Sequence, residues 1–130
     1  MNKDQLAIIA NIRKSLNDQH YLNAALPSAP FIQLLDADGK LSHARVSKDG
    51  LWVDLVYDEF MPGDTVLFYL GSATPGIVDY EDRFTLSEEK KIVALVPEDT
   101  INRLIGQTAF ALYFVNETTP SNFKYFDVIE

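Results

Sequence analysis

The sequence predicts a mostly-β sandwich preceded by one helix, and three observations support this prediction. Short apolar segments recur along most of the chain, and turn-forming residues separate them at close intervals. A helical repeat of apolar residues is confined to the N-terminal segment. The length of 130 residues fits one domain, and the absence of cysteine means that its core forms without disulfides.

The first segment has the spacing of an amphipathic helix. Leu6, Ile9, Ile12 and Leu16 recur at intervals of three and four residues, and polar side chains fill the opposite side. A lone short helix is marginally stable in water, so packing on its own domain is favoured over a role as a free interaction helix.

Two prolines, Pro27 and Pro30, end this helix and begin an extended stretch. We therefore divide the chain into an N-terminal helix and linker, residues 1–26, and a sandwich domain, residues 27–130.

The sandwich domain alternates between apolar stretches and turns. The predicted strands are residues 31–35, 41–46, 51–57, 65–70, 83–86, 91–96, 107–116 and 123–129. Residues 71–82 are predicted to be a polar loop. Residues 97–106 are predicted to hold a short helix, because proline and acidic residues begin the segment and glycine ends it. Alternation within the strands predicts a core that includes Val53, Leu55, Val66, Phe68, Ile92, Ala94, Ala111 and Tyr113.

Several short motifs resemble one known family. The motifs are Met61-Pro62-Gly63-Asp64-Thr65-Val66 before a strand, Val96-Pro97 at the end of a strand, and Gly106-Gln107-Thr108 before the strand that holds Tyr113. Over residues 31–129 the chain resembles a single immunoglobulin-like domain of the type repeated in large bacterial surface and adhesin proteins. The resemblance implies an immunoglobulin-like β-sandwich of about seven strands, a spacer or binding role, and no catalytic residues. The N-terminal helix and the lack of a signal sequence depart from that pattern and favour a free-standing accessory, assembly or adaptor protein.

The charge balance excludes some partners. With 19 acidic and 11 basic residues the formal net charge is −8, which repels nucleic-acid phosphates and anionic lipid. No apolar run approaches the roughly 20 residues that cross a membrane. The N-terminal segment has no secretory signal pattern, so a cytoplasmic location is expected, and leaderless export stays open.

The sequence offers little catalytic chemistry. His20 and His43 are its histidines, and no nucleophile elbow, phosphate-binding loop or dinucleotide motif accompanies them. His43 is expected in a strand beside Ser42, where neighbouring side chains point to opposite faces. We therefore expect no enzyme activity and no cofactor, and a small hydrolase is the weakest of three hypotheses.

Apolar residues occupy both faces of strands 65–70 and 107–116, although one face of a sandwich strand is usually polar. The face away from the predicted core carries Leu67, Tyr69, Phe110, Leu112 and Phe114, and we call it the aromatic face. The N-terminal helix, a second copy of the chain or another protein could cover it. A homodimer or a different protein partner is favoured, because one short helix covers little of two strands. The first hypothesis is thus a non-catalytic interaction or assembly module that uses this face.

The alternative hypothesis is a module that binds carbohydrate or calcium with acidic loops at one end. Oxygen ligands suit calcium, and alternate loops of a sandwich gather at the same end. The candidate residues are Asp58, Glu59, Asp64, Glu88, Glu89 and Glu117. A solvated acidic rim is favoured over a metal site there.

Overall fold

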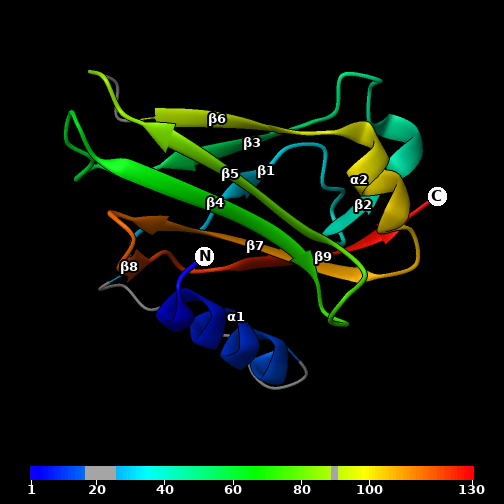
Figure 1. Ribbon diagram of the computed structural model, residues 1–130. Helices are drawn as coiled ribbons and strands as arrows, with labels where there is room; N and C mark the ends of the chain where they lie inside the picture. Colours follow the sequence, from blue (N-terminus) through cyan, green and yellow to red (C-terminus); the bar gives the residue numbers. More distant parts are fainter. Residues whose placement is uncertain (17–25, 89–90) are drawn as a thin grey trace.

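A three-stranded sheet, a larger second sheet and helix α1 (Lys3–Ser15) stack as three layers in the computed structural model (Figure 1). The structure describes residues 1–16, 26–88 and 91–130. The mostly-β sandwich with an N-terminal helix, predicted from the sequence, is confirmed.

The first sheet contains β1 (Phe31–Ile32), β3 (Leu51–Val56) and β6 (Lys91–Val96) in the order β1-β3-β6, and both of its pairings are antiparallel. Alternate residues of β3 are buried, as a strand with one covered face requires. The predicted turn before β3 depends on Gly50, whose φ is +118° and whose position a Cβ could not occupy without striking the carbonyl oxygen of Val96.

The second sheet has the strand order β2-β9-β7-β4-β5. Its strands are β2 (Lys40–Ser42), β9 (Lys124–Ile129), β7 (Thr108–Val115), β4 (Thr65–Ser72) and β5 (Asp79–Thr85), and β8 (Thr119–Pro120) pairs with β7. β2 pairs with β9 in parallel. The pairings of β9 with β7, of β7 with β4 and of β4 with β5 are antiparallel. The early strands β1 and β2 therefore belong to different sheets, and the chain crosses the edge of the sandwich between them.

Three predicted boundaries are wrong. Residues 31–35 form a strand over Phe31–Ile32 only, because the chain turns at residues 33–34. Residues 41–46 do not form one strand, because β2 finds a partner in β9 over three residues only and the chain then turns into a 3₁₀ helix, η1 (His43–Arg45). Residues 71–82 are not all loop, because β5 begins at Asp79 and pairs with β4. Its alternating charged residues are typical of an edge strand exposed to solvent, which is why the sequence resembled a loop. The short helix predicted before β7 is present as α2 (Glu98–Arg103).

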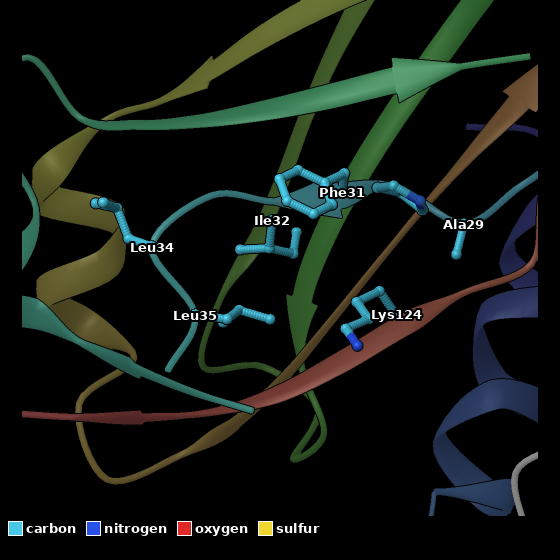
Figure 2. Close-up of a pocket in the computed structure, with 7 residues that line it drawn as sticks. Ala29, Phe31, Ile32, Leu34, Leu35 and Lys124 are labelled. Carbon is cyan, nitrogen blue, oxygen red and sulfur yellow. The ribbon is translucent and has the colours of Figure 1, made fainter. Parts of the chain in front are cut away.

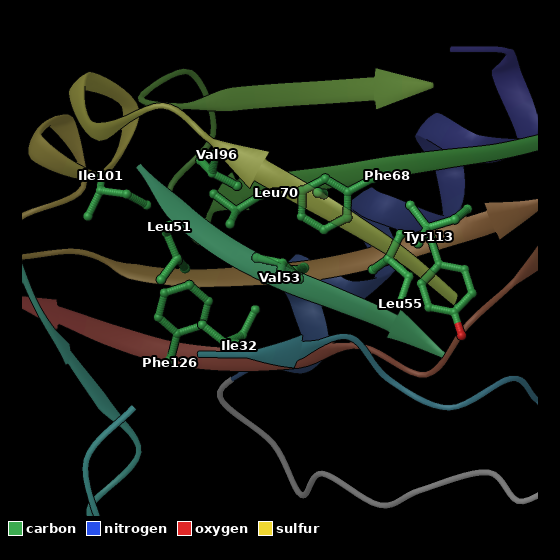
Figure 3. Packing of buried hydrophobic residues seen from close by; sticks show 14 of the residues in the cluster. Ile32, Leu51, Val53, Leu55, Phe68, Leu70, Val96, Ile101, Tyr113 and Phe126 are labelled. Carbon is green, nitrogen blue, oxygen red and sulfur yellow. The ribbon is translucent and has the colours of Figure 1, made fainter. Parts of the chain in front are cut away.

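The core lies between the two sheets (Figure 3). All eight predicted core residues are buried there, so the alternation in the sequence assigned these side chains to the correct face. Tyr113 is among the largest buried side chains, and its hydroxyl donates a hydrogen bond to the carbonyl oxygen of Ser28 at 2.6 Å. Burial raises the pKa of this phenol.

Helix α1 begins with a capping box. The side-chain oxygen of Asn2 accepts from the backbone N–H of Gln5, and Oε1 of Gln5 accepts from the N–H of Asn2, both at 2.9 Å. The buried Gln5 amide also donates to the carbonyl oxygen of Glu117 at 3.0 Å. Asn116 and Glu117 both have positive φ and form the tight turn between β7 and β8. The start of α1 is thus fixed to that turn.

No helix in the described ranges is both long enough and apolar enough to cross a membrane.

Candidate interaction surface

Helix α1 covers the aromatic face. Leu67 and Tyr69 of β4, and the three residues of β7 (Phe110, Leu112 and Phe114), form one buried cluster with Ile9 and Ile12 of the helix. The five side chains of the face are between 0% and 2% exposed. The cover therefore comes from the chain itself, and the binding surface expected at these residues is not available while α1 is in place.

The helix presents a slightly different side to the sheet than the sequence predicts. Leu6, expected against the aromatic face, is 53% exposed. Ile8 and Leu16 pack against the cluster beside Ile9 and Ile12, together with Met1 from before the helix.

Arg13 anchors the helix by polar contacts at one edge of the aromatic face. Its Nε donates to the carbonyl oxygen of Ser72 at 3.1 Å, and its Nη2 donates to the Tyr69 hydroxyl at 3.0 Å. The same Nη2 forms an ion pair with Asp79 at 3.2 Å, and the guanidinium lies 5.5 Å from the centre of the Phe110 ring. One side chain of α1 thereby contacts β4, β5 and β7.

The phenol of Tyr69 is held between two groups of opposite charge. Its hydroxyl hydrogen-bonds to Asp79 and accepts from Arg13. Burial, followed by the hydrogen bond to Asp79, raises the pKa of Tyr69, and the charge of Arg13 opposes this rise. The ring also lies so close to Gly71 that a Cβ there would clash with the hydroxyl.

Among the described residues, the acidic candidates for calcium do not come together as one site. Asp64 accepts hydrogen bonds from the side-chain amide of Asn116 at 3.0 Å and from the backbone N–H of Met61 at 2.8 Å. These bonds, the first above all, lower the pKa of the Asp64 carboxyl. Asp64 is therefore committed to holding the turn that leads into β4.

The other acidic candidates have separate partners. Glu59 accepts from the Tyr57 hydroxyl, and Glu117 pairs with Arg83 at 3.0 Å. Asp58 follows β3, Glu88 follows β5, and Glu89 lies outside the described residues. Within the described part of the chain, no three histidine, aspartate or glutamate side chains group as a metal site would require.

His43 does not lie in a strand, contrary to the prediction. It begins η1, and its Nε2 lies 2.6 Å from Oε1 of Glu98 at the start of α2. The neighbouring Ser42 hydroxyl donates to the carbonyl oxygen of Glu130 at 2.8 Å, so it does not point at the imidazole as a paired nucleophile would. His20 lies outside the described residues.

A second apolar surface lies on the outer side of the first sheet. Figure 1 shows no described helix or strand over this side, whereas α1 lies beneath the second sheet. Phe31 is 64% exposed and Trp52 is 44% exposed. We call this surface the sheet patch, and its apolar members are Phe31, Trp52, Val56, Val93 and Leu95.

Strand register brings the sheet patch together. Phe31 pairs with Asp54, which pairs with Val93 on its other side, and Trp52 pairs with Leu95 in the next row. At the centre, the carboxylate of Asp54 lies 3.9 Å from Nζ of Lys91. Exposed apolar side chains thus surround a loose pair of opposite charges.

The sequence contained a signal for this patch. Alternation along β3 places Trp52 and Val56 on the face opposite Leu51, Val53 and Leu55, and the burial pattern of the strand agrees with this. What the sequence could not show was which of the two sheets the helix would cover, because that depends on packing between distant segments.

A small pocket adjoins the sheet patch where the chain crosses from one sheet to the other (Figure 2). Its volume is about 270 Å³. It is lined by Ala29, Pro30, Phe31, Ile32, Leu34, Leu35 and Lys124. Six of these residues are apolar, and the seventh, from β9, supplies an ammonium group.

Together, these features define the chain as a β-sandwich domain with one helix-covered sheet and one sheet with an apolar outer face. No family model matches the chain, and no curated protein matches it. A solved structure, the sensor domain of the anti-sigma factor RsgI4 of Pseudobacteroides cellulosolvens, resembles it with a TM-score of 0.46 and 12% identity, over 82% of this chain and 98% of that one. No residue role is transferred from it.

Proposed function

We propose that the chain is a non-catalytic assembly module that associates with a second copy of itself through the sheet patch. The observation behind this proposal is the exposure of Phe31 and Trp52 side by side on an uncovered sheet face. Clustered exposed apolar side chains mark interaction surfaces, and aromatic residues often dominate their binding energy. The interaction surface expected from the sequence is thereby moved from the second sheet to the first.

The distribution of charge supports a second copy as the partner. The chain carries a net charge of −8, so two copies repel each other over most of their surface. The sheet patch contains one acid, Asp54, and one base, Lys91, and adds no net charge. In a two-fold arrangement each of these groups can face its opposite on the other copy.

The strand order supports an immunoglobulin-like type of sandwich. β1, β3 and β6 correspond to strands A, B and E of that fold, and β9, β7, β4 and β5 correspond to G, F, C and C′. The short helix α2 crosses between β6 and β7, where E passes to F. We infer on this basis an immunoglobulin-like domain, and membership of the bacterial adhesin type stays a prediction.

Sedimentation equilibrium tests self-association, with the fluorescence of Trp52, the single tryptophan, as a second readout. We expect mass to rise with concentration and tryptophan emission to shift to the blue as Trp52 is buried. Trp52→Glu should abolish the rise in mass, whereas Ile77→Glu, which adds the same charge at an exposed apolar residue outside the patch, should not.

Two results would overturn the proposal. One is a protein that stays monomeric at every concentration up to about 1 mM. Its free energy of association would then be less favourable than roughly −4 kcal/mol. The other is an equal loss of association in both variants, which would show a general effect of charge.

A further inference from the structure

We propose that the pocket between β1 and β9 is a binding site for a small carboxylate with an apolar body, and that Lys124 pairs with the carboxylate. This inference does not depend on self-association. It rests on the lining of the pocket, on the cations beside it and on the backbone that shapes it.

The walls of the pocket suit an apolar body. Ile32 is 2% exposed and belongs to the main core, and Leu35 packs against the same core. Figure 2 shows the side chains of Ile32 and Leu35 with Lys124 nearby on β9. A volume of about 270 Å³ lies just below the range of roughly 300–1,000 Å³ typical of sites for drug-sized ligands. The site is therefore sized for a short chain or a single ring.

Two cations lie at this pocket, Lys124 in its lining and Arg45 beside it. Lys124 lines it, and no ion pair joins Lys124 to a carboxylate among the described residues. Arg45 lies at the Leu34 side, where its Nη1 donates to the carbonyl oxygen of Leu34 at 3.2 Å. An apolar site with a cation at its edge is complementary to an amphiphilic anion, and it disfavours an amphiphilic cation.

The backbone of the pocket is held in a costly conformation. Leu34 has a φ of +71°, a left-handed conformation that is unfavourable for a residue with a Cβ. The hydrogen bond from Arg45 and the turn that follows, in which Asp36 donates to the carbonyl oxygen of Lys40 at 2.9 Å, hold the segment in place. Strained residues of this kind concentrate at ligand sites. These hydrogen bonds fix the wall of the pocket at Leu34 in this conformation.

Amide chemical shifts of the full chain, titrated with octanoate, test the proposal. We expect octanoate to shift the amides of Ile32, Leu35 and Lys124 in a saturable way, while octyltrimethylammonium leaves them unchanged. Lys124→Glu should weaken octanoate binding at least tenfold, and Lys124→Arg should retain it. Lys48→Glu makes the same charge change at an exposed residue outside both the pocket and the sheet patch, and it should leave the affinity within about twofold.

Three outcomes would overturn the proposal. They are the absence of saturable shifts at these amides up to about 10 mM octanoate, equal shifts with the anionic and cationic amphiphiles, and equal weakening by Lys124→Glu and Lys48→Glu. Trp52→Glu, which tests self-association, should leave octanoate binding intact, so the two proposals fail independently.

Discussion

Nη2 of Arg13 lies 3.0 Å from the hydroxyl oxygen of Tyr69, so helix α1 is hydrogen-bonded to a side chain of the very face that it covers. An apolar face alone would accept a sliding or rotated helix, because burial of apolar surface is not directional. The Arg13 guanidinium fixes one position of the helix on the sheet, because it also hydrogen-bonds to Ser72 and Asp79.

Replacing Arg13 should therefore destabilise the domain. Arg13→Met leaves the buried carbonyl oxygen of Ser72 without this donor, and we expect the free energy of unfolding to fall by about 1–3 kcal/mol. Urea denaturation measures the change. Arg103→Met removes an exposed ion pair with Asp99 and should stay within about 0.5 kcal/mol. Similar losses in both variants would contradict the anchoring role.

The packing of α1 can be tested with two residues of the same helix. Ile9→Ala removes a side chain that is 2% exposed and should cost about 2–5 kcal/mol. Leu6→Ala removes the exposed side chain and should change stability by no more than about 0.5 kcal/mol. If thermal denaturation ranked Leu6→Ala as the more harmful change, the helix would be rotated relative to the structure described above.

Two phenylalanines, Phe68 in the core between the sheets and Phe31 outside it, form a matched pair for testing the core. Phe68 is fully buried, and Phe68→Ala should lower the free energy of unfolding by about 3–5 kcal/mol. Phe31 is largely exposed, and Phe31→Ala should fall within about 0.5 kcal/mol in the monomer. A change in Phe68→Ala as small as that of a surface residue would show that the core lies elsewhere. Chemical denaturation at low protein concentration measures both.

The hydrogen bonds of Asp64, in the turn before β4, predict how the stability of the domain depends on pH. The hydrogen bond from Asn116 lowers the pKa of Asp64 below its ordinary 3.8, so the contribution of this carboxylate to stability is present above pH 3.8. It is lost as the pH falls through the lower, folded-state pKa. Asn116→Gly tolerates the left-handed backbone, φ +52°, and removes the amide.

We expect the Asp64 carboxyl to titrate closer to 3.8 in Asn116→Gly, as measured by carbon NMR of the side chain. An unchanged Asp64 pKa in the variant would show that the backbone of Met61 alone causes the shift.

Local pattern was enough to predict the strands and most of the core, because alternation is a property of neighbouring residues. Local pattern did not predict which side of α1 is buried, because Leu6 is exposed and Gln5 is buried. Gln5 is polar yet buried, because its amide satisfies both Asn2 and the carbonyl oxygen of Glu117. That partner lies 112 residues away in the sequence, so no repeat within the helix could indicate it.

The same limit applies to the cover of the aromatic face. The sequence correctly showed that β4 and β7 are apolar on both faces and need a second cover. Whether a helix or a partner supplies that cover depends on where residues 1–16 lie in space. The exposed Phe31 and Trp52 stood in the sequence as ordinary strand residues, and the missing cover over their sheet became visible only in three dimensions.

The parallel pairing of β2 with β9 determines when β2 can find its partner strand during synthesis of the chain. Ser42 and its hydrogen-bond partner Glu130 are 88 residues apart, so β2 has no strand to pair with until β9 has been made. A growing chain that stops before Lys124 leaves β2 unpaired and one edge of β7 open along Thr108–Ala111. Open edges of this kind pair with other chains, so the nascent domain is most prone to aggregation just before its last strand emerges from the ribosome.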